Sequence, residues 1–157
     1  MPPRPEPPIP LPVPDREDFY LQSLAAEVHR TYFFKYPPLP VRWGQQITRK
    51  KRRSIRLGSY NHHTTEIRIH PILNAREVPA VFIMSVIHHE YLHHVLGAHH
   101  NRRFHQHERQ FRYHREAQEW IRRNLFLLLG RKKHELRPRV GMVERAPAVQ
   151  PVQAALF

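Results

Sequence analysis

Apolar residues recur every three to four positions in the part of the chain that follows its proline-rich start. They are Phe19, Tyr20, Leu24, Val28 and Tyr32. This spacing places them on one face of a helix. Asp15 suits the N-cap, and the acidic Glu17 and Asp18 suit the first turn, where the helix dipole favours negative charge. The pattern predicts an amphipathic helix that begins at Asp15 and ends near the sequence YPPLP.

Three short segments with strand-like character follow, namely VRWGQQI, RSIRLGSY and TTEIRIH. The last two alternate apolar and polar residues on either side of SYNHHT, with Ile55 and Leu57 in one and Ile67 and Ile69 in the other. Pro71 closes the last segment, because proline lacks the N–H that a strand ladder needs. We expect two or three short antiparallel strands.

The segment PAVFIMSVIHHEYLHHVLG begins with Pro79, which suits a first helical turn, and ends at Gly97, which suits a helix C-terminus. Its apolar residues cover most of the helix circumference, which predicts a helix packed into the core. They are Val81, Phe82, Ile83, Met84, Val86, Ile87, Leu92 and Val95. His89, Glu90 and His93 therefore lie on a mostly buried helix.

A further helix is predicted from Asn101, a suitable N-cap, to Gly130, with a kink near FRYHR. Its apolar positions are Phe104, Phe111, Ala117, Trp120, Ile121 and Leu125. The two ends of the chain show no such period, and their composition buries too little apolar surface to fold. The sequence thus predicts one α+β domain over residues 15–130, between a disordered proline-rich leader at 1–14 and a flexible basic tail at 131–157.

Cysteine is absent from the 157 residues, so any metal must be held by imidazole or carboxylate groups. Lysine and arginine outnumber aspartate and glutamate by 26 to 13, a formal net charge of +13. Such a charge favours a polyanionic partner such as nucleic acid, although a cationic protein without that partner has the same composition. Neither a signal-peptide pattern nor a membrane-length apolar run is visible. We expect a monomeric, cytoplasmic protein that does not associate with membranes.

Histidine crowds the segment MSVIHHEYLHHVLGAHHNRRFHQHE, which holds eight of the chain's fourteen histidines. His89 and His93 are the only two histidines in the sequence that lie four positions apart. On a helix this spacing places both rings on one face, about 6 Å apart, where they can bind one ion. With Glu90 they form the H-E-x-x-H motif of zinc hydrolases, in which the glutamate is the general base. The alternative for Glu90 is a surface residue paired with an arginine.

Catalytic zinc sites usually take three protein ligands and leave the fourth position to water. His99 and His100 are both placed to supply the third, and we favour His100 because Asn101 as N-cap would set it at the mouth of the next helix. Glu108 is either a ligand or the acceptor of a ligand's second ring N–H, and we favour the second role. Other histidines are expected to face solvent or to lie nearby without binding: His62, His63, His88, His94, His105 and His107.

These segments resemble the SprT-like zinc metallopeptidases, a family that includes the bacterial SprT proteins and the Spartan DNA–protein crosslink protease. The resemblance rests on HHEYLHH, HNRRF, the hairpin IRLGSYNHHTTEIRIHP and EAQEW, and it covers Arg52 to Asn124, roughly half the chain. It implies a zincin-like fold and a protein or peptide substrate. The residues that match the family's Zn²⁺ ligands are His89, His93 and His100, and the residue that matches its catalytic base is Glu90. The cysteine-rich zinc ribbon of some relatives is absent.

A basic run, Arg49 to Arg56, precedes the predicted hairpin, with Trp43 and Tyr60 nearby. It is either a phosphate-binding segment, with salt-dependent and sequence-independent binding, or a solvated strand edge protected by its charge. Two functions follow as hypotheses. One is a zinc metallopeptidase, acting on nucleic-acid-associated proteins if the basic run binds nucleic acid. The other is a non-enzymatic nucleic-acid-binding module whose metal is structural or absent.

Overall fold

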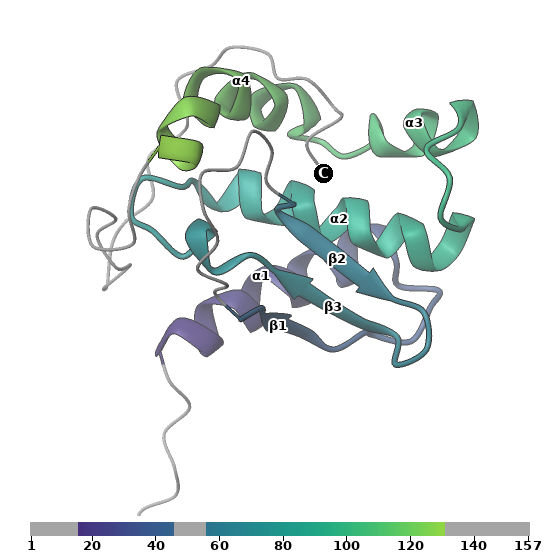
Figure 1. Ribbon diagram of the computed structural model, residues 1–157. Coiled ribbons are helices and arrows are strands. Elements are labelled where there is room, and N and C mark those ends of the chain that lie inside the picture. Colours follow the sequence, from purple (N-terminus) through teal and green to yellow (C-terminus); the bar gives the residue numbers. More distant parts are fainter. Residues whose placement is uncertain (1–15, 46–55, 131–157) are drawn as a thin grey trace, which may run out of the picture.

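The computed structural model describes residues 16–45 and 56–130. These residues form four α-helices and a small three-stranded sheet, which confirms the α+β class (Figure 1). The elements are α1 (Arg16–Tyr32), β1 (Val41–Trp43), β2 (Gly58–Asn61), β3 (Glu66–Ile69), the 3-10 helix η1 (Pro71–Leu73), α2 (Ala80–Leu96), α3 (Arg102–Glu108) and α4 (His114–Gly130). The predicted leader and tail, the Asp15 cap, and all of the basic run except Arg56 lie outside the described residues.

The sheet is mixed, with β3 between β1 and β2. Ile67 in β3 pairs with Tyr60 of β2 in antiparallel fashion on one side and with Val41 of β1 in parallel fashion on the other. The prediction of antiparallel strands is therefore confirmed for the hairpin β2–β3 and wrong for β1. Alternation of apolar and polar residues reports which face a strand buries, and it carries no information about strand direction.

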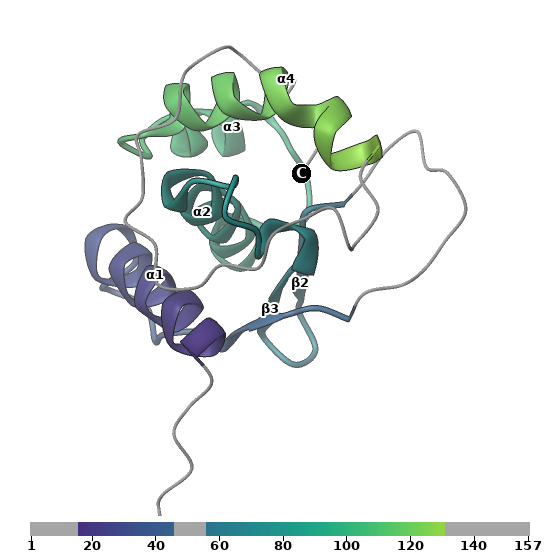
Figure 2. The ribbon, with the colours of Figure 1, turned by 90° about the vertical axis from the view of Figure 1, so that its left-hand side faces the viewer.

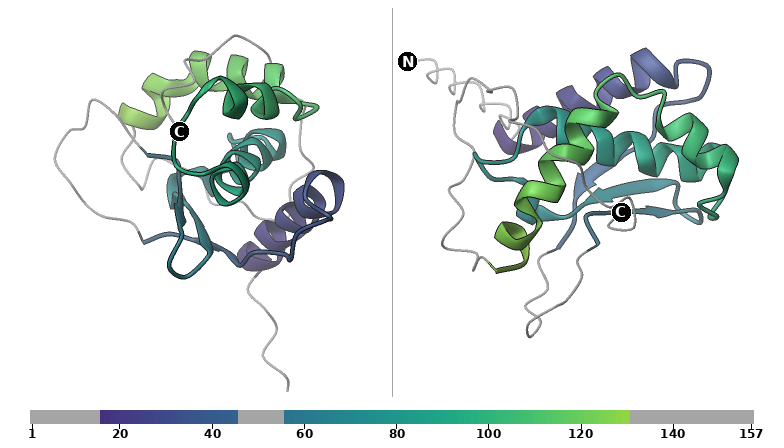
Figure 3. Two further views of the ribbon diagram at one scale, coloured as in Figure 1. Left: turned by 90° about the vertical axis from the view of Figure 1, so that its right-hand side faces the viewer. Right: turned by 90° about the horizontal axis from the view of Figure 1, so that it is seen from above.

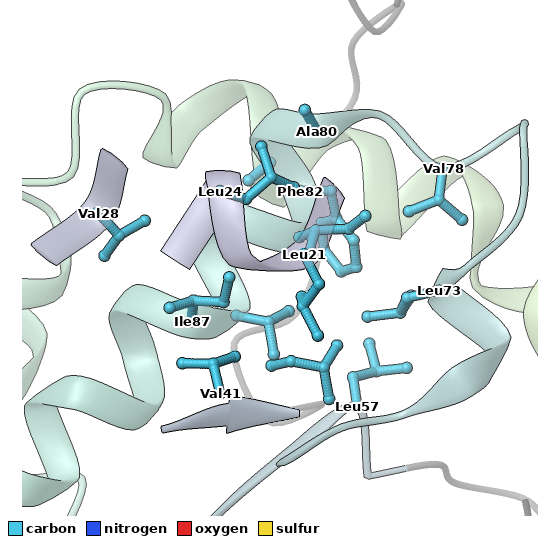
Figure 4. Close-up of a cluster of buried hydrophobic side chains, with 14 of the residues drawn as sticks. Leu21, Leu24, Val28, Val41, Leu57, Leu73, Val78, Ala80, Phe82 and Ile87 are labelled. Carbon is cyan, nitrogen blue, oxygen red and sulfur yellow. The ribbon is translucent and has the colours of Figure 1, made fainter. Parts of the chain in front are cut away.

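Helix α2 lies in the middle of the described structure, with α1 and the sheet on one side and α3 and α4 on the other (Figure 2). Its apolar residues on all sides explain this position, because they leave no polar face for solvent. Side chains from α1, β1, η1 and the segment before β2 belong to the same buried cluster, among them Leu21, Val28, Val41, Leu57 and Leu73 (Figure 4). The prediction of a core helix is confirmed. Within residues 16–45 and 56–130, no helix is long and apolar enough to cross a membrane.

Helix α2 ends at Gly97, whose φ of 95° is a backbone conformation that favours glycine. The Gly97 N–H donates to the carbonyl oxygen of His93 at 3.1 Å. After a short connection, Asn101 caps α3 as predicted, because its Oδ1 accepts a hydrogen bond from the Phe104 N–H at 2.9 Å. The path of the chain from α2 into α3 is thus set by Gly97 and by the Asn101 cap, and both residues can be recognised in the sequence.

The single kinked helix predicted up to Gly130 is instead two helices, α3 and α4, separated by a turn at residues 109–113 (Figure 3). Phe111 in this turn is buried and packs against the ring of Tyr32, with centroids 5.4 Å apart. The Tyr32 hydroxyl also accepts a hydrogen bond from the Arg112 N–H at 3.0 Å. The break is therefore stabilised by tertiary contacts with α1, since neither glycine nor proline occupies the turn.

Candidate metal centre

Three histidines from two parts of the chain meet near the C-terminal end of α2. His89 and His93 project from α2 one turn apart, and His100 comes from the segment before α3. Their Nε2 atoms form a nearly equilateral triangle, with separations of 3.2 Å for His89–His93, 3.2 Å for His89–His100 and 3.0 Å for His93–His100. Among the described residues this is the one group of three or more histidines or carboxylates close enough to bind a metal ion.

The Nδ1 atoms of the two helical histidines face oxygen acceptors. The Nδ1 of His89 is hydrogen-bonded to the Glu108 carboxylate, and the Nδ1 of His93 lies 2.9 Å from the Gly97 carbonyl oxygen. Burial raises the pKa of Glu108, but the hydrogen bond and charge of His89 and the neighbouring histidines outweigh it, so the pKa is lowered. Because an ionised carboxylate and a carbonyl only accept, each Nδ1 carries the hydrogen. The Nε2 lone pairs therefore point at the common centre.

Phe104 forms the floor beneath the three imidazoles. Its ring centroid lies 4.9 Å from that of His89, 4.8 Å from that of His93 and 4.9 Å from that of His100, and the side chain is 0% exposed. The Asn101 cap fixes the start of α3 and thereby sets Phe104 and His100 together. The histidine rings are thus held by packing from below as well as by hydrogen bonds at their rims.

The protonation of the three histidines suits metal binding. Burial is the largest influence on each, and it lowers the pKa of His89, His93 and His100. Their mutual positive charges lower these pKa values further, whereas the hydrogen bonds of His89 and His93 act in the opposite direction. Neutral imidazole is the form that binds a metal.

Glu90 lies beside this group and is 1% exposed. Its Oε2 is buried and has no hydrogen-bond partner among the described residues. Burial raises the pKa of Glu90 to about 7, and the positive charge of Arg56 opposes the rise. Glu90 is thus buried, whereas the alternative interpretation of the sequence was a surface residue paired with an arginine. A buried carboxyl whose pKa is near neutrality can both accept and release a proton.

Gly58, the first residue of β2, makes room for Glu90. A Cβ atom at this position would lie 2.9 Å from Oε1 of Glu90, 3.1 Å from its Cγ and 2.6 Å from Cγ1 of Val86. Any larger residue would push the carboxyl away from its present place. The close approach of β2 to α2 thus positions Glu90 without contributing a side chain.

A cavity of about 620 Å³ opens in front of Glu90 and the histidines. It is lined by Arg56, Tyr60, His62, Glu90, His93, Gly97, Ala98 and His100. The buried carboxyl and two of the three histidines therefore face the same space. A molecule in this cavity would contact the candidate metal ligands and the candidate base together.

The sequence left open whether His99 or His100 joins His89 and His93, and whether Glu108 is a ligand or a hydrogen-bond acceptor. The structure distinguishes between these options. His99 and His100 are both exposed, and only His100 joins the group of three. Glu108 holds the ring of His89 and is not one of the three residues around the common centre. The position of His100 agrees with the argument from the Asn101 cap, and that of Glu108 agrees with the favoured role.

His88, for which the sequence left open whether it faces solvent or lies nearby without binding, is buried and is not one of the three residues around the common centre. It is 3% exposed and packs against the rings of Tyr32, Phe33 and Phe111, with centroids 5.0, 5.2 and 5.3 Å away. Two features of the site were missed, namely the Phe104 floor and a hydrogen bond between Tyr60 and His94. The Tyr60–His94 pair depends on how the hairpin lies against α2, and no local pattern in the sequence signals it.

Comparisons of the whole chain with protein-family models and with curated proteins identify no relative. No protein-family model matches the sequence, and no curated protein matches it.

Proposed function

We propose that this protein is a zinc-dependent metallopeptidase of the SprT-like, zincin-like type, which hydrolyses peptide bonds in proteins or peptides. The observation that carries the proposal is the triangle of Nε2 atoms with a buried carboxyl beside it in one cavity. Zinc–nitrogen distances of about 2.0–2.1 Å in a tetrahedral site require nitrogen atoms about 3.3 Å apart. The separations of 3.0–3.2 Å among His89, His93 and His100 are close to this value. The residues present thus fit zinc with three nitrogen ligands.

Each residue then has a chemical role. Zinc held by the three histidines would polarise the substrate carbonyl and make a water molecule more acidic. Glu90 accepts a proton from the attacking water and later delivers it to the leaving amine. Its pKa of about 7 suits both transfers, because a base is most effective when its pKa lies near the working pH. Glu108 keeps the proton of His89 on Nδ1, which orients its Nε2 for the ion.

The test separates metal binding from catalysis. Glu90→Gln keeps the size of the side chain and removes the base, so we expect one bound zinc per chain and cleavage of an unfolded protein lowered at least 100-fold. His93→Ala and His100→Ala should lose both zinc and cleavage. Glu27→Gln, an exposed change on α1, is the matched control and should retain both. Wild-type cleavage rates in Glu90→Gln would refute the proposed role of this residue.

Nucleic-acid binding is a second proposal, supported by arginines on and between α3 and α4. Seven of them are exposed: Arg102, Arg103, Arg109, Arg112, Arg115, Arg122 and Arg123. Together with the net charge of +13 they suit contact with phosphates. Duplex or single-stranded DNA binding that weakens steeply with salt and survives chelation, without any proteolysis, would favour the non-enzymatic module. The same binding together with cleavage would favour a peptidase that acts on nucleic-acid-associated proteins.

A further inference from the structure

The proposed reaction leaves one developing charge without a partner from the protein. The carbonyl oxygen of a peptide becomes negative as the nucleophile adds to its carbon. A hydrogen-bond donor held in place before the reaction typically contributes about 10²–10³ in kcat. Among the residues lining the cavity, three side chains with donor groups have no role in the proposal so far: Arg56, Tyr60 and His62.

Of these three, Tyr60 is held by a side chain of α2. Its hydroxyl lies 2.5 Å from Nδ1 of His94, and the two rings meet edge to face with centroids 5.4 Å apart. Arg56 and His62 are both exposed, and the Arg56 Nε donates to the backbone carbonyl of Gly58, two residues further along the chain, at 3.1 Å. Tyr60 is half-buried and packs against the core. It is therefore the most rigidly placed of the three donors.

The hydrogen-bonding capacity of a phenol allows Tyr60 to serve two partners at once. A phenolic oxygen can accept one hydrogen bond while its own hydrogen is donated elsewhere. When His94 carries its hydrogen on Nδ1 and donates it to the Tyr60 oxygen, the phenolic hydrogen is left for a group in the cavity. Burial raises the pKa of Tyr60, so the hydroxyl stays protonated at neutral pH.

We propose that Tyr60 is a further catalytic residue, whose hydroxyl donates a hydrogen bond to the carbonyl oxygen as negative charge develops there, and that His94 is its positioning residue. This inference rests on the proposed function. In the addition step, the water oxygen gives a proton to Glu90 and bonds to the carbonyl carbon, and the π pair moves onto the carbonyl oxygen facing Tyr60. When that pair returns, the C–N bond breaks and the amine takes the proton from Glu90. Tyr60 keeps its proton throughout.

The test of this role removes only the hydroxyl group of Tyr60. Tyr60→Phe and wild type are compared on one fluorogenic peptide that the wild type cleaves, with zinc content measured in parallel. We expect kcat to fall about 10²–10³-fold while KM and zinc content stay unchanged, because the lost hydrogen bond belongs to the transition state. A phosphinic version of the same peptide, which carries a tetrahedral anion, should bind Tyr60→Phe more weakly by a similar factor. Tyr36→Phe, at an exposed tyrosine outside the cavity lining, is the matched control.

The positioning role of His94 has its own readout. His94→Phe should lower kcat in the wild-type background, and it should have no further effect in the Tyr60→Phe background if it acts through the tyrosine. Additive losses would overturn the positioning role. Wild-type kcat in Tyr60→Phe, or loss of its zinc, would overturn the inference and leave the proposed function intact. A zinc-loaded wild type that cleaves no peptide would overturn both.

Discussion

Two adjacent histidines on α2, His88 and His89, are equally buried and differ in what surrounds them. They are 3% and 2% exposed. His88 sits among aromatic rings from α1 and from the turn before α4. His89 has the Glu108 carboxylate at its Nδ1 and two other imidazole nitrogens 3.2 Å from its Nε2. Burial is common to both positions, and only one of them has the partners of a metal ligand.

The difference shows what makes a buried histidine a candidate ligand. A neutral imidazole in an aromatic pocket behaves as a flat, largely apolar ring. The pKa of His88 is lowered to about 3, chiefly by burial, with neighbouring histidines adding to the shift and the charge of Glu108 opposing it. At His89 an acceptor fixes the tautomer and directs the free lone pair, and further nitrogens converge on the same point. Orientation by hydrogen bonding, more than burial, therefore separates the candidate metal centre from the core of the same helix.

The largest expected effect comes from exchanging each ring for phenylalanine. His88→Phe should retain one zinc per chain, because the replacement is another ring in an aromatic pocket. His89→Phe should retain none, because it removes a proposed ligand together with the Nδ1 group that is hydrogen-bonded to Glu108. Metal analysis after dialysis measures both. His89→Phe also disturbs a buried carboxylate, so His93→Ala, at a half-buried position, provides a second test. Equal zinc content in all three variants would contradict the distinction between His88 as a core residue and His89 as a proposed ligand.

Much of this site could be predicted from the sequence, because its key features are local. The four-residue spacing of His89 and His93 and the Asn101 cap are properties of single helices, and both are present as expected. The burial of His88 was also predictable, since an all-round apolar helix hides every residue near its middle. The direction of β1 and the contact between Tyr60 and His94 were not predictable, because they depend on how distant segments pack.

A smaller effect is expected at Glu108, which distinguishes the surroundings of His89 from those of His88. Glu108→Gln keeps an oxygen that can accept from His89 but removes the charge that holds the proton on Nδ1. Zinc affinity should fall 10- to 100-fold, as is typical when the partner of a ligand histidine is changed. Competition with a fluorescent chelator measures the affinity. Glu119→Gln, which alters the ion pair of half-buried Glu119 with exposed Arg115 on α4, should leave the zinc affinity unchanged.

A further prediction concerns His88 and the dependence of the free energy of unfolding on pH. Its pKa is about 3 in the folded protein and about 6.5 when unfolded, so between these values the unfolded chain binds a proton that the folded chain does not. The free energy of unfolding should therefore fall as the pH drops below 6.5, by about 1.4 kcal/mol per pH unit from this residue. Above pH 6.5 the residue should contribute no pH dependence.

Urea unfolding of wild type and His88→Phe at pH 7 and pH 5, with a chelator present, measures this contribution. The wild type should lose about 2 kcal/mol more than the variant between the two pH values. The other histidines are common to both proteins, so their contributions cancel in the difference. Parallel losses would mean that His88 is protonated in the folded state, and the aromatic pocket would then not exclude charge.

The smallest effect on metal binding is expected at the two phenylalanines that pack against these histidines. Phe104 touches all three histidines of the candidate metal centre, whereas Phe111 touches His88. Both side chains are buried, so replacing either with leucine should lower the free energy of unfolding by about 1 kcal/mol. Only Phe104→Leu should also weaken zinc binding, and by less than tenfold, because His89 and His93 keep their hydrogen-bond acceptors. Zinc titration and thermal unfolding of the two variants would show whether the floor of the site contributes to affinity apart from its contribution to stability.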